Sequence, residues 1–358
     1  QNTSMGGVTV GMREGMLMNI ENPAGLTALD SCKLFAEASA FVKNERYRSD
    51  GSSSNAFTGN FSAFSLGGRI MRRWYMSAGV TPYSFVGYYF KSSQELEGSP
   101  GTFVTSTFSG TGGLSKAFLS QGFSLTKHLS VGMNLNFIFG NMTQNEIQSA
   151  MTVSREMSGR SFYADFGLQY HRPIARETFL TVGAIYGYKQ RISLKNTVTV
   201  TGSSTETPYN QKRVTQYLPQ YIGIGSSLAH KKWTYALDYL FRQYGVLNSS
   251  DSRVKFRDSH ELRLGVCYFP NGFSSSSYWK RMSYKAGVSV STPYLRLKGQ
   301  SGGAYRVSVG LGLPVLNGRI NTAFYYDRLQ LQGNALRRDI MGFTVTYTLS
   351  EKFYQVKL

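Results

Sequence analysis

The chain has 358 residues, with 39 Lys and Arg against 20 Asp and Glu, so its formal net charge is +19. Only 16% of the residues are charged and 14% are aromatic, a balance that excludes a disordered tail protein. No stretch reaches the roughly 18 consecutive apolar residues of a membrane-spanning helix. Two cysteines and four scattered histidines predict neither a disulfide scaffold nor a metal centre.

Residues 1–31 come before any strand pattern and are rich in Gly and Met. The chain opens at Gln1 without a hydrophobic signal region, and we interpret Gln1 as a mature N-terminus from which a signal peptide has been removed.

From residue 32 onward, apolar residues recur with period two, as in strands that bury one face in an apolar environment. In the stretch 162–170, Phe162, Phe166 and Leu168 fall on one face and Tyr163 and Asp165 on the other. The alternation predicts fourteen strands, at 32–43, 57–70, 73–82, 112–125, 128–140, 161–171, 177–190, 215–229, 232–244, 259–269, 281–292, 303–313, 319–330 and 339–350.

The predicted strands are mostly about 10–14 residues long, which suits a tilted crossing of a bilayer better than a soluble sheet. Short connections at 71–72, 126–127 and 230–231 alternate with long polar ones, predicted to be loops, at 44–56, 83–111, 141–160, 191–214 and 245–258. An even strand number with short turns on one side and long loops on the other is typical of an outer-membrane barrel of a Gram-negative bacterium. We therefore predict an all-β, 14-stranded antiparallel transmembrane barrel over residues 32–358, with residues 1–31 as a short plug inside it. A mobile periplasmic tail is the alternative for residues 1–31.

Short motifs along the chain resemble the FadL/TodX superfamily of long-chain fatty acid transporters, in the form common in Bacteroidetes. The resemblance rests on Met5-Gly6-Gly7 and Asn22-Pro23-Ala24-Gly25-Leu26 before the first strand, and on Leu218-Pro219, Trp233 and Asp238-Tyr239 further on. It implies a fourteen-stranded barrel with an N-terminal hatch, from which hydrophobic compounds leave sideways into the membrane. The predicted plug is shorter than the hatch of the fatty acid transporters, and some relatives with short N-termini resemble subunits of larger outer-membrane machines.

Catalytic patterns are sparse, and we expect no enzyme activity, no cofactor and no bound metal. The histidines lie at or beside predicted turns and strand ends, and no phosphate-binding or dinucleotide-binding glycine motif is present. Ionisable residues on the predicted inner face are better candidates for a functional role than the histidines are. They are expected to brace the barrel, for example through an Asp238–Arg242 pair, or alternatively to hold a fatty acid carboxylate. These residues are Asp165, Asp238, Arg242, Arg263, Lys285 and Arg306.

Aromatic residues near the predicted outer rim form the candidate ligand-binding surface: Phe85, Tyr88, Tyr89, Phe90, Phe137 and Phe139. Gly67 and Gly68 in the second strand mark a candidate lateral gap, or a bend that barrel curvature requires.

Basic residues cluster at the predicted periplasmic turns, including Lys231, Lys232, Lys280 and Arg281. They are expected to contact anionic lipid headgroups or an acidic periplasmic partner. The basic residues of the opposite rim are expected to contact lipopolysaccharide. Nucleic acid is not expected, because the basic residues follow turns and do not form one stripe with stacked aromatics.

The leading functional hypothesis is passive uptake of hydrophobic, fatty-acid-like small molecules through plug rearrangement or lateral opening. The alternative is a non-transporting barrel subunit of a larger outer-membrane protein assembly, in secretion or barrel insertion. A nonspecific diffusion porin fits less well, because the barrel is narrow and carries a plug.

Overall fold

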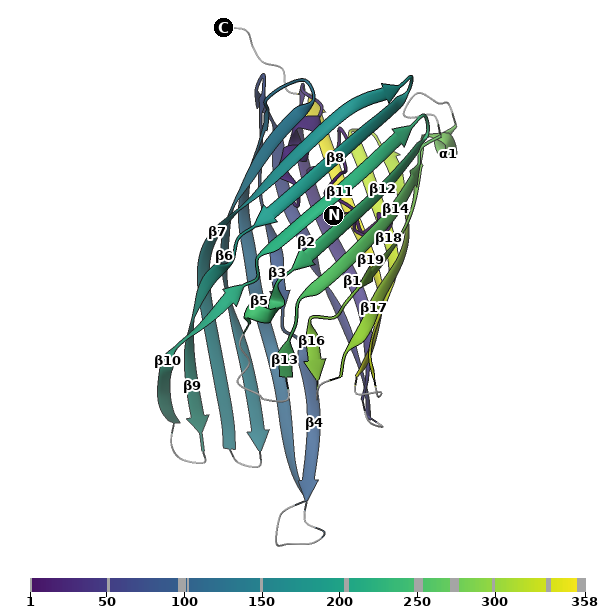
Figure 1. The fold of residues 1–358 in the computed structure, drawn as a ribbon. Helices are drawn as coiled ribbons and strands as arrows, with labels where there is room; N and C mark the ends of the chain where they lie inside the picture. The colour runs from purple at the N-terminus through teal and green to yellow at the C-terminus, as the bar shows by residue number, and fades with distance from the viewer. Residues whose placement is uncertain are drawn as a thin grey trace.

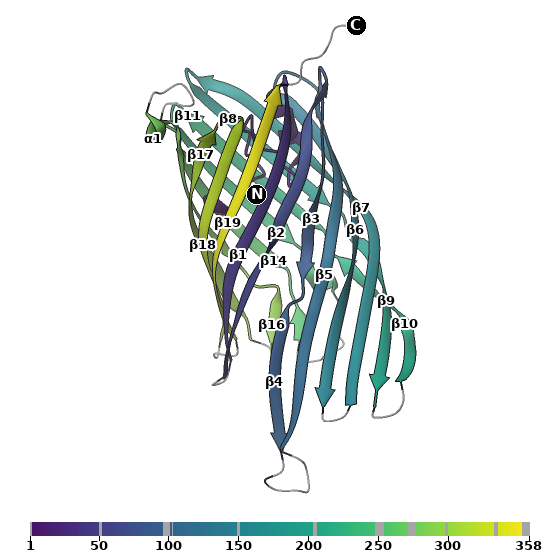
Figure 2. The ribbon, with the colours of Figure 1, turned by 180° about the vertical axis from the view of Figure 1, so that it is seen from behind.

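The chain forms one closed antiparallel β-barrel in the computed structural model, which describes residues 2–49, 52–95, 101, 103–148, 151–202, 206–247, 254–270, 277–297, 300–332 and 336–352 (Figures 1 and 2). The barrel closes where β1 (Lys33–Ser49) pairs with β2 (Ser52–Met71) on one side and β19 (Arg337–Lys352) on the other. Because the first strand also pairs with the last one, the described sheet closes on itself, as a lipid environment requires.

Fourteen strands make up the wall, so the predicted fold class is confirmed. Each predicted strand range overlaps one of the barrel strands. Three of these strands are each divided into two pieces, namely β3 with β4, β8 with β9, and β10 with β11. Between β2 and β19 the pieces are β3 (Trp74–Phe85), β4 (Tyr88–Glu95), β5 (Phe103–Ser124), β6 (Leu129–Gln148), β7 (Met151–Ala175), β8 (Thr178–Gly187), β9 (Gln190–Thr201), β10 (Glu206–Leu218), β11 (Tyr221–His230), β12 (Trp233–Arg242), β14 (Ser259–Tyr268), β15 (Ser283–Ser291), β17 (Gly302–Val315) and β18 (Gly318–Leu331).

The period-two pattern separates the two faces of the wall. On β7, Phe162 and Phe166 are 58% and 45% exposed on the outer face, whereas Asp165 is 3% exposed on the inner one. A barrel with an apolar outer surface and polar inner positions is the architecture of transmembrane barrels. The alternation predicted for this strand is confirmed.

Tall hairpins replace most of the predicted long loops, and the prediction of loops at 44–56, 83–111, 141–160 and 191–214 is wrong over most of their described parts. β6 and β7 stay paired from Leu129–Tyr170 to Gln148–Met151, and β9 pairs with β10 over most of its length. These segments are rich in Ser, Thr and Val, which suit a pleated sheet, but their polar residues fall on both faces and erase the alternation. The barrel is therefore much taller at this end than the sequence pattern indicates (Figure 1).

The short elements lie at the two ends of the barrel. The helix α1 (Tyr278–Arg281) lies at the short-turn end, while β13 (Val254–Phe256) pairs with β16 (Leu295–Leu297) toward the tall-hairpin end (Figure 1). The 3-10 helix η3 (Tyr244–Val246) follows β12. No helix in the described ranges has the length and apolar character to cross a membrane.

The N-terminal segment, residues 2–31, lies inside the barrel and is called the plug below. It contains two 3-10 helices, η1 (Thr3–Met5) and η2 (Pro23–Ala28). Its residues Met5, Val10 and Leu26 are at most 1% exposed, because they pack between barrel strands on different sides of the lumen.

Candidate functional site

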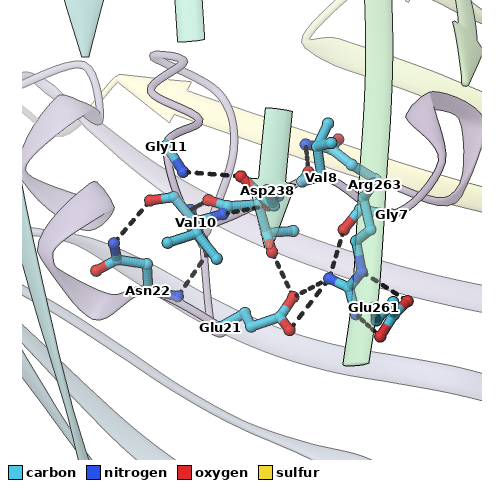
Figure 3. A network of polar contacts seen from close by, with 12 residues as sticks. Gly7, Val8, Val10, Gly11, Glu21, Asn22, Asp238, Glu261 and Arg263 are labelled. Carbon is cyan, nitrogen blue, oxygen red and sulfur yellow. Dashed lines mark hydrogen bonds and ion pairs between the residues drawn. The ribbon is translucent and has the colours of Figure 1, made fainter. Parts of the chain in front are cut away.

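The carboxylate of Asp238 holds the middle of the plug. From β12 it accepts the backbone N–H groups of Thr9 at 2.6 Å, Val10 at 2.9 Å and Gly11 at 3.4 Å (Figure 3). Three successive backbone donors thus satisfy the hydrogen-bonding capacity of this buried carboxylate. Ser227 of β11 adds a hydrogen bond from its hydroxyl to the Gly11 carbonyl at 2.7 Å.

The side chain of Asn22 joins three parts of the molecule. Its Nδ2 donates to the Val10 carbonyl at 2.7 Å and to the Leu168 carbonyl of β7 at 3.2 Å, and its Oδ1 caps η2 by accepting from the Ala24 N–H at 3.2 Å. Asn22 and the next four residues, Pro23, Ala24, Gly25 and Leu26, are all buried. The structure thus gives this motif a role in fastening the plug to the wall.

A chain of ion pairs holds the side of the plug that faces the tall hairpins. Arg263 of β14 donates to the Gly7 carbonyl at 2.8 Å and lies 3.2 Å from Glu21 and 2.8 Å from Glu261 (Figure 3). Glu261 also binds Arg242 at 2.7 Å. Burial alone would raise the pKa of Glu21, but the nearby guanidinium groups of Arg263 and Arg242 outweigh it and hold that pKa below its ordinary value.

A second ion pair lies toward the short turns. Arg319 of β18 contacts Glu14 of the plug at 2.5 Å and also binds the hydroxyl of Ser283. Burial disfavours the charged form of Glu14, but Lys285 and Arg319 outweigh it and lower its pKa to about 2.

Inward-facing glycines let the plug backbone touch the wall on several sides. A Cβ atom on Gly265 of β14 would lie 2.6 Å from the Met5 carbonyl oxygen, and one on Gly122 of β5 would lie 2.8 Å from the Pro23 carbonyl oxygen. At Gly132, Gly167, Gly183 and Gly287, such an atom would collide with the plug. Only glycine permits this approach, so the plug and wall fit each other closely.

The predicted lumen charges divide into separate sets. The predicted pairing of Asp238 with Arg242 is wrong, because Asp238 binds backbone amides of the plug whereas Arg242 binds Glu261. Asp165 of β7 accepts hydrogen bonds from Asn134 at 2.5 Å and Asn136 at 2.8 Å. Arg263 holds the plug and Glu261, as described above. Lys285 and Arg306 contact wall residues: Lys285 Nζ lies 3.4 Å from Asn321 Oδ1, and Arg306 binds Asp327 through two nitrogens at 2.5 and 2.7 Å.

A chamber of about 750 Å³ lies between the plug and the tall hairpins. Its floor includes Ile20 and Glu21 of the plug, and its walls carry Lys116, Asp165 and Arg242. Tyrosine rings form much of the remaining lining: Tyr83, Tyr163, Tyr188, Tyr217, Tyr221, Tyr244 and Tyr294. The chamber thus offers aromatic surface together with charges, a combination that suits a molecule with both apolar and polar parts.

The pairing of β2 with β3 ends beside this chamber. The ladder runs from Met71–Trp74 to Phe64–Val80, while β2 continues along β1 to Ser52, and β3 and β4 continue along β5 (Figure 2). Ser62 is the extra residue of a bulge in β2, and Pro82 of β3 has no N–H to offer a ladder. The Thr81 hydroxyl donates to the Ser62 carbonyl at 3.0 Å, and Ser62, Ala63, Thr81 and Tyr83 all line the chamber.

The predicted ligand-binding aromatics lie elsewhere than the chamber lining. Phe137 and Phe139 stack on each other on the outer face of β6, with ring centroids 5.7 Å apart. Phe85 ends β3, and Tyr88 and Tyr89 begin β4; all three are exposed. The backbone of Phe90 lies in β4, but its side chain falls outside the described part of the structure.

Gly67 and Gly68 have strand neighbours on both sides. They pair with Phe35 and Leu34 of β1 and with residues of β3, so the ladder is continuous there. The pairing ends three residues earlier in β2, at Phe64.

Sequence reasoning missed the chamber tyrosines and Lys116. Tyr163 and Tyr221 occupy inner positions of strands whose outer faces are strongly apolar, and that alternation was the available signal. Lys116 lies among Ser, Leu and Ala in β5, and nothing in that pattern marks it as lumen-facing. Within the described residues, no group of three or more His, Cys, Asp or Glu side chains is placed to hold a metal ion.

Solved structures with a similar fold are channels and transporters. The toluene transporter TodX of P. putida matches with a TM-score of 0.64 at 15% identity, over 99% of this chain and 98% of that one. The toluene transporter TbuX of Ralstonia pickettii gives a TM-score of 0.60 at 14% identity, over 98% and 97% of the two chains. A FadL homologue of Pseudomonas aeruginosa gives 0.62 at 12% identity, over 99% and 98%. These likenesses bear out the FadL-type fold expected from the sequence.

No curated protein sequence matches the chain. The family described as BamG, however, matches residues 1–357. Since this match spans nearly the full length, plug and barrel together, the chain belongs to the BamG family.

Proposed function

We propose that this protein is an outer-membrane barrel of the FadL type that lets hydrophobic small molecules pass sideways from its chamber into the membrane. The observation that carries this proposal is the end of the β2–β3 ladder at Phe64–Val80, directly beside a chamber that Ser62 and Thr81 help to line. A molecule that leaves there crosses the wall without entering the space below the plug.

The fastening of the plug favours this sideways route over one through the lumen. A path along the barrel axis would have to break the contacts of Asp238, Asn22 and Arg263 with the plug. Each removed partner leaves a buried polar group unsatisfied, at about 1–3 kcal/mol per group. Across the end of the β2–β3 ladder, the described side-chain hydrogen bond that the lateral path would break is the one from Thr81 to the Ser62 carbonyl.

The chamber lining indicates the class of solute. Tyrosine rings supply apolar area and hydroxyl groups, and Lys116 provides a cation near Asp165 and Glu21. An aromatic or long-chain compound with one polar end suits this lining. The titles of two similar structures name toluene transporters, which supports a hydrophobic solute for this chain as well. We expect passage to be passive, with no chemical step.

The orientation follows that of outer-membrane barrels, with short turns in the periplasm and tall hairpins outside. The basic residues of the short turns would then face anionic phospholipid headgroups, and the basic residues of the opposite rim would face lipopolysaccharide.

A second candidate function is a non-transporting subunit of a larger outer-membrane protein assembly. It is favoured by the buried charges of the chamber, since Asp165, Lys116 and Arg242 lose solvation when an apolar solute covers them. The closely fitted plug also suits a permanently closed barrel. Under this proposal the tall hairpins and the basic turns would contact the partner proteins.

A reversible cross-link across the end of the ladder tests the leading proposal. Ser62→Cys and Thr81→Cys would be combined in a chain that also carries Cys32→Ser and Cys267→Ala, and cells would be assayed for uptake of radiolabelled toluene and oleate. Oxidation should abolish uptake, and reduction should restore it. The matched control is Ser39→Cys with Thr346→Cys, because these two hydroxyls lie 2.8 Å apart in the same chamber but on strands that are already paired.

The outcome separates the two candidates. Uptake that is lost with the first pair and kept with the control supports lateral passage. The opposite outcome is that cells with either cysteine pair take up neither solute, while gentle extraction of both recovers a stoichiometric protein complex. That result would rule out transport and support the role as an assembly subunit.

A further inference from the structure

An apolar groove runs over the outer face of the wall made by β8, β11, β12, β14 and β15, which face the viewer in Figure 1. Its volume is about 500 Å³. Small outward residues at its two sides, Ser226 and Ala286, leave a depression beside Leu237 and Leu264, which are 42% and 50% exposed. The groove does not belong to the chamber, because these side chains alternate with the inward ones.

Two rows of paired residues define the groove. One row runs across the strands through Leu180, Leu228, Tyr235, Val266 and Ala286. The next row, one step further from the short turns, runs through Ser226, Leu237, Leu264 and Val288. Both rows are apolar apart from Ser226 and the Tyr235 hydroxyl, so the groove suits a hydrocarbon chain.

Aromatic residues form the row between the groove and the short turns. Trp233, Tyr268 and Tyr284 are neighbours across β12, β14 and β15. The rings of Trp233 and Tyr268 lie 4.5 Å apart between centroids, and Trp233 also stacks on Tyr235 of the groove at 6.1 Å. Trp and Tyr in such a row mark the level of the lipid headgroups and glycerol.

Four cations lie beyond the aromatic row. Lys231 and Lys232 make the exposed turn between β11 and β12, and Lys280 and Arg281 end α1 just before β15. The Tyr284 hydroxyl donates to the Trp279 carbonyl at 3.2 Å, which holds α1 beside the aromatic row. Among the described residues, none of these four cations has a carboxylate partner, and the buried Nε of Arg281 has no hydrogen-bond partner.

We propose that this wall binds one anionic phospholipid, with its phosphate at the four cations, its glycerol region at the aromatic row and an acyl chain in the groove. The order of cation, aromatic and apolar rows along the wall matches the order of phosphate, glycerol and hydrocarbon in one leaflet. Charge complementarity selects an anionic headgroup, and the groove distinguishes this wall from a uniformly lipid-coated surface. The inference depends on a membrane position with the short turns at one leaflet, and it holds for a transporter and for an assembly subunit alike.

Native mass spectrometry of the full chain in detergent micelles supplemented with phosphatidylglycerol or phosphatidylcholine tests the proposal. We expect one phosphatidylglycerol to be retained in preference to phosphatidylcholine. Substitution of the cations by Ala should lower phosphatidylglycerol affinity about fivefold for each basic residue, with little effect on phosphatidylcholine. Ala286→Trp should fill the groove and release both lipids.

Matched controls use the same changes elsewhere on the barrel. Lys127→Ala removes an exposed cation from the turn between β5 and β6, and Ala164→Trp enlarges an outward residue of β7. Both should leave lipid retention unchanged, and heat-dependent mobility on a gel reports whether each variant is folded. Equal retention of the two lipids, or retention that the cation and groove substitutions leave unchanged, would overturn the proposal. A partner protein recovered on this wall in place of lipid would overturn it as well.

Discussion

Asp238 and Thr9 are separated by 229 positions in the sequence, yet the carboxylate of the first accepts the backbone N–H of the second at 2.6 Å. The same carboxylate binds the N–H groups of Val10 and Gly11, so one wall residue holds three successive plug amides. This contact makes the plug part of the barrel core.

Asp238→Ala should therefore loosen the plug. It leaves three buried N–H groups without an acceptor, and the cost in unfolding free energy is expected to be about 3 kcal/mol. Asp238→Asn keeps one oxygen acceptor and should cost less. The measurements are the temperature at which the barrel loses its heat-dependent gel mobility and the ion conductance in planar bilayers. The first should fall and the second rise, in the order wild type, Asn, Ala; identical values for Ala and wild type would contradict the assigned role of Asp238.

The contact of Gly132 with the plug is tested by a single methyl group. A Cβ atom there would collide with the backbone of Pro23 and Ala24, so Gly132→Ala should destabilise the protein by about 1–3 kcal/mol through overpacking. Gly303→Ala in β17 is the control, because a Cβ at Gly303 meets open space. Chemical unfolding in detergent measures both variants. Equal stabilities for the two would show that the plug is able to move away from the wall.

Glu14 makes the stability of the plug depend on pH. Its folded pKa of about 2 lies below its ordinary value of 4.5, so its contribution is complete above pH 4.5 and is lost as the pH falls toward 2. Glu14→Gln should therefore be less stable than wild type at pH 7, and the two should converge near pH 2. Unfolding temperatures over this range measure the effect. A Glu14→Gln variant whose unfolding temperature runs parallel to that of wild type at every pH would exclude the ion pair with Arg319.

Lys116 tests which solutes use the chamber. If a carboxylate-bearing solute enters, Lys116→Leu should reduce oleate uptake severalfold while toluene uptake is maintained, because only the former needs a cation. Lys116→Arg keeps the charge and should retain both activities. Competition assays in cells with matched barrel levels measure the two uptake rates. A parallel loss of both solutes in the Leu variant would point to a structural role beside Asp165.

The alternation of apolar and polar residues correctly predicted which side chains of the barrel wall face outward and which face inward. Phe162 and Phe166 face outward and Tyr163 and Asp165 inward, because neighbouring side chains of a strand must point to opposite faces whatever the rest of the chain does. The same rule did not identify the tall hairpins, since a strand outside the membrane has polar residues on both faces and loses the period-two signal. In the β6–β7 hairpin, for example, the polar residues Thr143 and Glu156 pair across the two strands, and no apolar face marks either strand in the sequence.

Local chemistry along the chain thus determined the fourteen strands, the apolar outer face and the basic turns. The tertiary structure alone decided which charge meets which partner, as in the contact of Asp238 with plug amides in place of Arg242. It also placed the end of the β2–β3 ladder at the bulge of Ser62, and it brought Trp233, Tyr268 and Lys280 to one edge of the wall. The reason is physical: strand alternation is a property of adjacent residues, whereas register, bulge position and plug contacts depend on closure of the whole barrel around a segment from the other end of the sequence.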